Sequence, residues 1–466
     1  MWHGGRLTAP EWVPWGKPRF ERLLLGLVAF ATLSPVYARG TQDVTRLCLS
    51  HALLHGHLTI EPCAGSTIDH ATYAGHVYSD KAPGFSLVAM PIVAVADLFA
   101  THGWEQGEWH VWFVRIATSG LALIALAFLV GRIAEGISPG YGAATLVAFA
   151  LGTYVAPLAA TTFDHVLAGA FAFAGFVLAW SRRYELAGLL VAMAVDTNYL
   201  CALIALVVAA YVAWAGPRPL ARFAAGAAGP LLLLGAYDWA AFGSPFHISY
   251  SYVANHYSHQ QASGVFGIHA PYAHAVQQVF VGGRGILVAC PILVAAVGGI
   301  VLLAKRHRVE AIVCGAIFGA LVLANCGYFL PYGGESPGPR FLVPSLPFIA
   351  LGLAPAFARW FRTTVVLAAV SVVAMTALTL TWHQRVPAAD RQTPWRAIER
   401  LLLGGEQSLR SHSPLAPTIF DWIGIGHAGA AALVCLAAGS AFVLALRRRS
   451  LPATPRPDLE TASEPC

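Results

Sequence analysis

The chain has 466 residues, of which 57% are hydrophobic and only 11% are Asp, Glu, Lys or Arg. Soluble globular proteins carry about 25% charged residues, so this chain has too few charges to cover its surface in water, and we expect lipid to cover it. The net charge of +6 comes mainly from basic residues that flank hydrophobic segments. It therefore reports membrane topology and argues against nucleic-acid binding.

Hydrophobic segments alternate with polar loops along the chain. A membrane-spanning helix needs about 20 apolar residues, or fewer where the helix is short or broken. The candidate spans are residues 21–38, 111–131, 140–158, 165–181, 184–196, 199–215, 220–242, 285–304, 309–330, 341–359, 363–382 and 428–446. The sequence therefore predicts an all-α polytopic membrane protein with about 12 transmembrane helices, which form a single membrane domain over residues 21–446.

Basic residues gather in the loops between alternate spans. They are Arg132, Arg182, Arg183, Arg218, Arg222, Lys305, Arg306, Arg308, Arg359, Arg362, Arg447, Arg448 and Arg449. By the positive-inside rule, both termini lie in the cytoplasm, with residues 1–20 before the first span and a disordered tail over 447–466. The loops 39–110, 243–284 and 383–427 then lie on the periplasmic or extracellular face of the plasma (inner) membrane, where we expect the active site.

Two segments depart from a simple series of spans. The apolar run 84–100 reaches only about 25 Å as a helix, and counting it as a span would place every later basic cluster outside. We therefore expect an interfacial or re-entrant helix on the outer side of the first loop. The residues Asp196–Asn198 interrupt a second apolar stretch, which predicts two short spans joined by a polar elbow.

Asp43 follows the first span by a few residues and stands at the membrane surface. An apolar stripe after it, ending near Gly56, predicts a short juxtamembrane helix. Asp43 could cap the N-terminus of this helix, or it could act as a general base that deprotonates an acceptor hydroxyl. Cys48 and Cys63 share the same loop and could pair in an oxidising compartment.

Lys81 lies in a turn that Pro83 and Gly84 make rigid. A lysine is a compact charge suited to phosphate, although it could also be a residue that extends its ammonium group to the membrane interface. Asp80 could hold Lys81 in place or serve as a second carboxylate, and Asp69 is a further candidate in the same loop.

Arg284 and Arg340 each end an outer loop and follow glycines, in Gly282-Gly283-Arg284 and Gly333-Gly334-Glu335-Ser336-Pro337-Gly338-Pro339-Arg340. Glycine lets the backbone approach a ligand closely, and arginine binds phosphate with two hydrogen bonds. Together with Lys81 they predict a phosphate-binding cluster, against the simpler alternative that each anchors a helix end. The second run also matches a Gly-x-Ser-x-Gly pattern, but Pro337 lacks the backbone N–H that a nucleophile elbow needs.

Asp164 and Asp196 lie at the outer ends of predicted helices. Carboxylates within membrane segments are commonly functional, so both are further candidates for a second carboxylate. The outer loops are rich in His, but they contain no His-Glu-x-x-His motif and the chain has no Asp-x-Asp pair or P-loop. We therefore expect neither a metal nor a cofactor.

These motifs together resemble the polytopic glycosyltransferases of the GT-C fold, which include protein O-mannosyltransferases and the aminoarabinose transferases acting on lipid A. Those enzymes have a carboxylate after span one followed by a surface helix, similar to Asp43–Gly56. They also have an acidic-Lys-Pro turn, a second surface helix and a broken pair of spans, similar to Asp80–Pro83, residues 84–100 and the elbow at Asp196–Asn198. The resemblance covers about residues 20–385. Three further features are similar to those of a bacterial subgroup of membrane glycosyltransferases, namely Phe242-Gly-Ser-Pro245, Arg284-Gly285 and the glycine-rich run that ends at Arg340.

The resemblance implies transfer of a sugar from a polyprenyl-phosphate donor, with inversion, to a hydroxyl on a cell-envelope glycan, lipid or protein. Asp43 would take the acceptor proton, while Lys81, Arg284 and Arg340 would stabilise the departing phosphate without a metal. Two alternatives remain open: a transporter or flippase of a lipid-linked envelope precursor, and a ligase that uses a pyrophosphate-linked donor.

Overall fold

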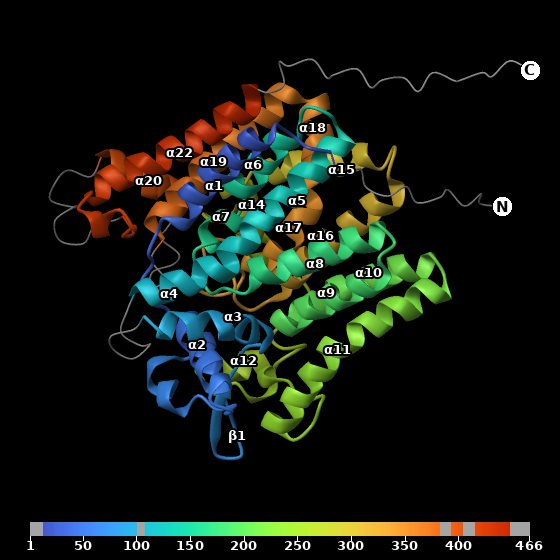
Figure 1. The fold of residues 1–466 in the computed structure, drawn as a ribbon, viewed down its shortest axis with the longest axis vertical. Coiled ribbons are helices and arrows are strands. Elements are labelled where there is room, and N and C mark those ends of the chain that lie inside the picture. The colour runs from blue at the N-terminus through green and yellow to red at the C-terminus, as the bar shows by residue number, and fades with distance from the viewer. Residues whose placement is uncertain (1–12, 100–107, 383–392, 404–414, 448–466) are drawn as a thin grey trace, which may run out of the picture.

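The computed structural model describes residues 13–99, 108–382, 393–403 and 415–447. These residues form helices almost throughout, with one short β-hairpin, so the predicted all-α class is confirmed (Figure 1). The predicted cytoplasmic segments 1–20 and 447–466 and the outer loop 383–427 lie wholly or partly outside the described residues.

Five helices are long and apolar enough to cross a membrane, and two bent helix pairs raise the number to seven if each pair is one span. The single helices are Glu108–Ile137 (α4, Glu108–Arg115, a π-helical turn, and α5, Leu121–Ile137), α11 (Pro217–Phe242), α16 (Arg308–Gly327), α19 (Phe361–Thr381) and α22 (His427–Arg447). The structure thus supports a multi-pass membrane protein, and it does not show the full predicted set of about 12 spans.

The bent pairs overlap the predicted spans 285–304 and 341–359, and the first pair begins within the predicted outer loop 243–284. One joins Ala273–Ala289, which contains α13 (Ala273–Val281) and α14 (Ile286–Ala289), to α15 (Ile292–Leu303) at 86°. The other joins Arg340–Ala350, which ends in α17 (Leu346–Ala350), to α18 (Leu353–Arg359) at 57°. Several other predicted spans appear as shorter apolar helices: α6 (Gly142–Gly152), α8 (His165–Trp180) and Tyr199–Trp214, which includes α10 (Ala202–Trp214).

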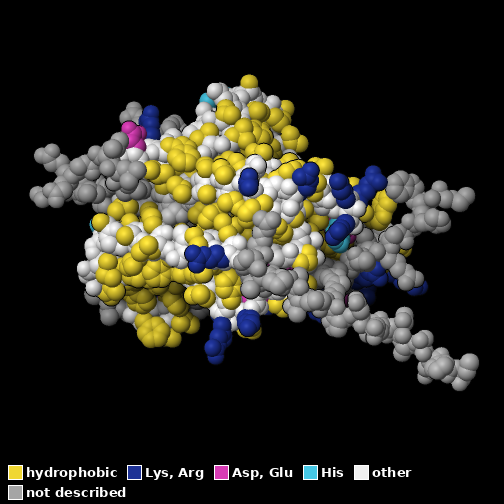
Figure 2. Space-filling view, turned by 90° about the horizontal axis from the view of Figure 1, so that it is seen from above, with side chains coloured by type: hydrophobic (Ala, Val, Ile, Leu, Met, Phe, Trp, Pro, Cys, Tyr) yellow, Lys and Arg dark blue, Asp and Glu magenta, His cyan; other side chains and the backbone are white. Residues whose placement is uncertain are grey.

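Small residues let the helices of the bundle approach closely. A Cβ on Gly188 of α9 (Tyr184–Thr197) would lie 1.9 Å from the carbonyl oxygen of Phe223 on α11, and one on Gly226 would lie 1.9 Å from that of Glu185. Such contacts are typical of helix packing in membranes. Large apolar side chains such as Leu206, Trp214 and Leu232 remain exposed, as expected for a surface covered by lipid. Figure 2 shows one face of the molecule, where Lys and Arg side chains lie among hydrophobic ones.

Residues 39–110, the loop that the sequence predicts to be the first outer loop and that we continue to call by that name, contain both of the predicted helices. After α1 (Pro18–Leu33), α2 (Thr41–Leu54) begins just before Asp43, and α3 (Gly84–Asp97) matches the predicted surface helix. A disulfide joins Cys48 on α2 to Cys63 in a 3-10 turn (Glu61–Ser66). Figure 1 shows α2, α3 and β1 gathered at one end of the helical bundle.

The hairpin of β1 (His70–Tyr73) and β2 (His76–Ser79) was not predicted. Its strands are antiparallel, and its turn places Ala74 and Gly75 at φ 51° and 84°. The second outer loop extends the hairpin, because Ala71 forms an isolated bridge with Val253. The hairpin therefore ties the first outer loop to the second and holds Asp69 and Asp80 at its two ends.

The polar elbow between two short helices is confirmed. Helix α9 ends at Thr197, Asn198 is extended, and a 3-10 turn (Tyr199–Cys201) leads into α10. The Asn198 side chain accepts a hydrogen bond from the Leu200 N–H and so caps the new turn. Gly84 is necessary opposite the elbow, since a Cβ there would lie 2.5 Å from the backbone of Asp196.

Candidate active site

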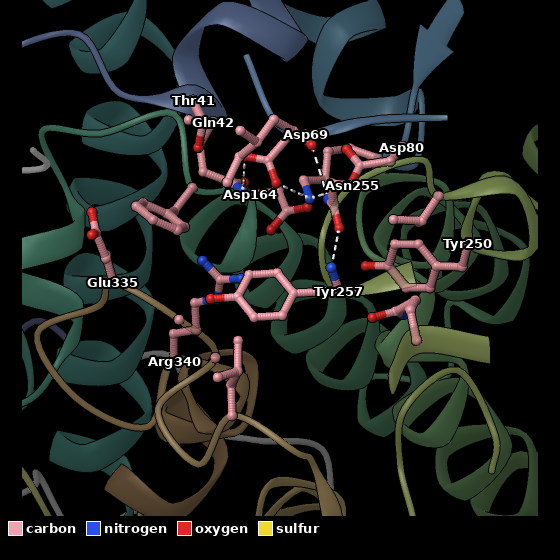
Figure 3. A pocket seen from close by; sticks show the side chains of 18 of the residues that line it. Thr41, Gln42, Asp69, Asp80, Asp164, Tyr250, Asn255, Tyr257, Glu335 and Arg340 are labelled. Carbon is pink, nitrogen blue, oxygen red and sulfur yellow. Dashed lines mark hydrogen bonds and ion pairs between the residues drawn. The ribbon is translucent and has the colours of Figure 1, made fainter. Parts of the chain in front are cut away.

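A cavity of about 350 Å³ lies where the outer segments meet. The start of α2, the two ends of the hairpin, the start of α8, the elbow and two outer loops all contribute to its wall (Figure 3). Its polar and charged lining residues are Thr41, Gln42, Arg46, Asp69, Asp80, Lys81, Asp164, His165, Asn198, Asn255, His256, Gln261, Glu335 and Arg340. The sequence-predicted residues Asp69, Asp80, Lys81, Asp164 and Arg340 are thus brought together in one cavity.

Lys81 stands between two carboxylates. Its Nζ lies 3.0 Å from Asp69 Oδ1 and 2.8 Å from Asp80 Oδ2. Burial disfavours the charged form of Lys81, but the charges of Asp69 and Asp80 outweigh burial and raise its pKa above the usual value. The ammonium group is therefore a fixed positive charge in the cavity wall.

The two carboxylates beside Lys81 differ. Burial acts to raise the pKa of Asp69, but the Lys81 charge and hydrogen bonds from Thr41 and Lys81 outweigh it, so the pKa lies below the usual value. The Asp69 Oδ2 also accepts a hydrogen bond of 2.9 Å from Gln42 Nε2. The pKa of Asp80 is instead raised, first by burial, against the Lys81 charge, and further by the charge of Asp69.

Helix α2 places Arg46 at the cavity, four residues after Gln42. Its Nη2 lies 2.7 Å from Oδ2 of Asp164, which immediately precedes α8, and its Nη1 donates to Oε1 of Gln42. The other oxygen of Asp164 accepts a hydrogen bond of 3.1 Å from Asn198 Nδ2, and His165 Nδ1 lies 2.8 Å from the same oxygen. This buried ion pair connects the first outer loop, α8 and the elbow.

Arg340 ends the glycine-rich loop and lies in the cavity wall. Its guanidinium stacks over Phe163 and Phe341, with Cζ 4.8 and 5.5 Å from the ring centroids. Among the described residues, no carboxylate lies within ion-pair distance of it, so its charge can serve a ligand. Gly333 must be glycine, because its φ is +78° and a Cβ there would lie 2.6 Å from Arg340 Nε.

Asp43 lies behind the cavity wall and is fully buried. Arg115 contacts both of its oxygens, with Nε 2.9 Å from Oδ1 and Nη2 2.6 Å from Oδ2. Thr162 and the Gly40 N–H donate to the same two oxygens, so Asp43 also caps α2 from its third position. Its predicted role as a general base stays a prediction, since the carboxylate lines no part of the described cavity.

Two other predicted residues also lie away from the cavity. Arg284 donates to the carbonyl oxygen of Ser336 and stacks over Tyr332, with Cζ 4.4 Å from the ring centroid. It thereby supports the loop that carries Arg340. Asp196 is buried at the end of α9 and does not line the cavity, although its neighbour Asn198 does.

Among the lining residues that sequence reasoning missed are Gln42, Arg46, Asn198 and Glu335. An arginine within the apolar stretch that follows Asp43 was an available signal for Arg46, since a buried arginine requires a charged partner. Aromatic rings complete the lining, namely Phe163, Tyr250, Tyr257, Tyr328, Phe329 and Phe341. Rings of this kind can stack on a sugar or a lipid chain. Within the described residues, no three His, Cys, Asp or Glu side chains group as metal ligands would.

No family model matches the sequence, and no curated protein matches it. Solved structures do match at the level of the fold. ArnT from Cupriavidus metallidurans in the apo state is 14% identical with a TM-score of 0.50, and the match covers 92% of this chain and 76% of ArnT. The same protein bound to undecaprenyl phosphate is 13% identical with a TM-score of 0.52, over the same shares of both chains.

The apo oligosaccharyltransferase from Archaeoglobus fulgidus is a further structure of this kind. It is 12% identical with a TM-score of 0.48, over 95% of this chain and 57% of that protein. The comparison with ArnT confirms the expected resemblance for the fold alone: over most of its length, the chain has a fold similar to that of ArnT.

Proposed function

We propose that this protein is an inverting membrane glycosyltransferase. It moves a sugar from a polyprenyl-phosphate donor to an acceptor hydroxyl of a cell-envelope glycan, lipid or protein, at the outer face of the inner membrane. The observation that carries this proposal is the cavity in which Lys81 and the unpaired guanidinium of Arg340 lie together. It occurs in a fold similar to that of ArnT, which has been solved with undecaprenyl phosphate bound.

The two cations have complementary roles in the proposed reaction. Lys81 is held by Asp69 and Asp80, so its ammonium group is fixed before the donor arrives. Arg340 is oriented by the rings of Phe163 and Phe341 and keeps its hydrogen-bond donors for phosphate oxygens. Because charge builds up on the phosphate as the bond to the sugar breaks, fixed cations stabilise the transition state more than the ground state.

No general acid is required in this scheme, because a lipid phosphate is already a fair leaving group. The acceptor oxygen attacks the anomeric carbon from the side opposite the phosphate, and the configuration of the sugar inverts. Lys81 and Arg340 supply the positive charge that a metal ion would otherwise provide. We therefore expect a chelator to leave turnover unchanged.

The first experiment measures release of polyprenyl phosphate from a panel of polyprenyl-phosphate sugars. The protein is purified in nanodiscs, and an envelope lipid extract provides acceptors. Wild-type protein should turn over at least one donor. Lys81→Met and Arg340→Met should weaken binding of undecaprenyl phosphate roughly tenfold or more, since each removes a charge-assisted contact.

Lys305→Met is a matched control, because Lys305 is exposed at the end of α15 and does not line the cavity. It should bind and turn over like the wild type. Binding of a lipid-linked sugar without turnover, even with acceptors present, would instead favour a transporter or flippase. Turnover of pyrophosphate-linked donors alone would favour the ligase alternative.

A further inference from the structure

Three of the four carboxylates that line the cavity are engaged by cations. Asp69 and Asp80 share Lys81, and Asp164 is paired with Arg46 and bonded to Asn198. The Lys81 charge keeps the pKa of Asp69 below the usual value, so its carboxylate is a weak base. Burial raises the pKa of Asp80, but its Oδ2 already lies 2.8 Å from Lys81 Nζ and is engaged by that ammonium group. An inverting transfer to a hydroxyl nevertheless needs a group that accepts the acceptor proton.

Glu335 is the remaining carboxylate in the cavity wall. It has no hydrogen bond or ion pair to any of the described residues, and its side chain is exposed. The backbone on the C-terminal side of Glu335 is held by a hydrogen bond. Gly334 has a φ of +96°, and Arg284 donates to the carbonyl oxygen of Ser336. The carboxylate is thus presented to the cavity on a supported loop while remaining open to solvent.

We propose that Glu335 is the catalytic base that deprotonates the acceptor hydroxyl, a proposal that rests on the proposed transferase function. The acceptor O–H bond breaks and its proton passes to the Glu335 carboxylate. The acceptor oxygen forms a bond to the anomeric carbon of the sugar. The bond from that carbon to the phosphate oxygen breaks, and its electron pair stays on the polyprenyl phosphate beside Lys81 and Arg340. Because Glu335 is exposed, the proton can then leave to water.

The layout of the cavity leaves one side free for an acceptor. Figure 3 shows Glu335 on one side of the cavity, Asp80 and Tyr250 on the opposite side, and Arg340 between them. Lys81 lies on the side of Asp80, because its Nζ is 2.8 Å from Asp80 Oδ2. A donor whose phosphate contacts Lys81 and Arg340 therefore leaves the side of Glu335 open for the acceptor.

The electrostatic environment of Glu335 suits this role. Although the side chain is open to solvent, the part of the carboxyl that faces the cavity wall is desolvated, and this raises its pKa above the usual value, against an opposing effect of the Arg284 charge. A base acts in its deprotonated form, so activity should fall as the pH drops through this pKa. Asp43 offers a contrast, because it is fully buried and its oxygens already accept hydrogen bonds from Arg115, Thr162 and Gly40.

The test compares Glu335→Gln with the wild type, using the donor that the wild type turns over. We expect kcat to fall roughly a hundredfold or more, while binding of undecaprenyl phosphate stays within twofold. The acid limb of the pH profile should disappear. In Glu335→Ala, added formate should restore part of the turnover, because a small carboxylate can replace the missing base. A purely structural role would produce neither change.

Glu108→Gln is the matched control, since Glu108 is exposed in another part of the outer surface and does not line this cavity. It should behave like the wild type. Wild-type turnover with an unchanged Glu335→Gln variant would overturn the assignment and leave the transferase intact. So would loss of activity without formate rescue, or an acid limb that is lost in Asp43→Asn instead. Absence of turnover in the wild type would overturn both proposals.

Discussion

At the scale of single residues, most charged side chains of the cavity form ion pairs, and these pairs make the stability of the folded protein depend on pH. The pKa of Asp69 in the folded protein lies below its usual value, with burial opposing and Lys81 lowering it. A carboxyl with a lowered pKa stabilises the folded state above the unfolded pKa of about 3.9, and this stabilisation is lost as the pH falls through the lower, folded value.

We therefore expect Asp69→Asn to cost roughly 1–3 kcal/mol at neutral pH, as for the loss of a hydrogen-bonded charge. The gap between the thermal unfolding midpoints of wild type and variant should narrow as the pH falls below about 4, because the wild type then loses the same charge. Thermal unfolding in detergent, followed by intrinsic tryptophan fluorescence, measures the two midpoints. A gap that stays constant with pH would show that the Asp69 charge does not contribute.

The sequence identified most of the charged residues that line the cavity, but it did not show which of them are paired with one another and which are available to a ligand. Lys81, Asp80 and Arg340 were expected at the outer face from their positions beside spans, and the structure brings them to one cavity. The sequence did not predict that the Asp43 side chain points away from the cavity, because its direction depends on Arg115, a residue 72 positions away. Glu335 was seen only as part of a glycine-rich motif, since nothing in a sequence shows that a carboxylate lacks a partner.

At the scale of secondary structure, two buried ion pairs fix α2 in place. Asp43 binds Arg115 at the end of α4, and Arg46 binds Asp164 before α8. Both side chains of the first pair are completely buried, so removing one partner leaves an uncompensated charge inside the protein. Breaking such a pair typically costs about 3–5 kcal/mol.

A double-mutant cycle tests the contribution of the Asp43–Arg115 ion pair to stability. Arg115→Met and Asp43→Asn should each lower the free energy of unfolding by about 3–5 kcal/mol. The double variant should lose clearly less than the sum, because it removes both charges together. Unfolding midpoints in detergent provide the measurement, with Arg222→Met as the control for an exposed ion pair, which is expected to cost under about 1 kcal/mol. Additive losses would mean that the two residues do not act as a pair.

The predictable elements are those with strong local signals. Pro83 and Gly84 mark the start of α3, and the polar residues Asp196–Asn198 mark the elbow. The hairpin was missed because its strands are four residues each and alternate weakly between polar and apolar residues. The bends of 86° and 57° were missed because a hydropathy profile depends only on composition. A sharply bent apolar helix has the same composition as a straight one.

At the scale of the whole molecule, hydropathy predicts more crossings than the helices support by their length. Helix α6 shows why, since all of its residues, Gly142–Gly152, are buried against other parts of the protein. An apolar segment covered by protein and one covered by lipid have the same hydropathy. The same small residues that let helices pack closely also make short buried helices resemble spans.

The basic loops predict an orientation in the membrane, and this orientation can be measured directly. Arg183 lies exposed in the turn between α8 and α9, which we expect in the cytoplasm, and Gln260 lies exposed on α12 (Ser258–Ala262), which belongs to the outer loop beside the cavity. In a background with Cys435→Ala and Cys466→Ala, a membrane-impermeant maleimide applied to intact cells should label Gln260→Cys and spare Arg183→Cys. Both should react after detergent solubilisation. The reverse pattern would place the cavity on the cytoplasmic side and would contradict transfer at the outer face.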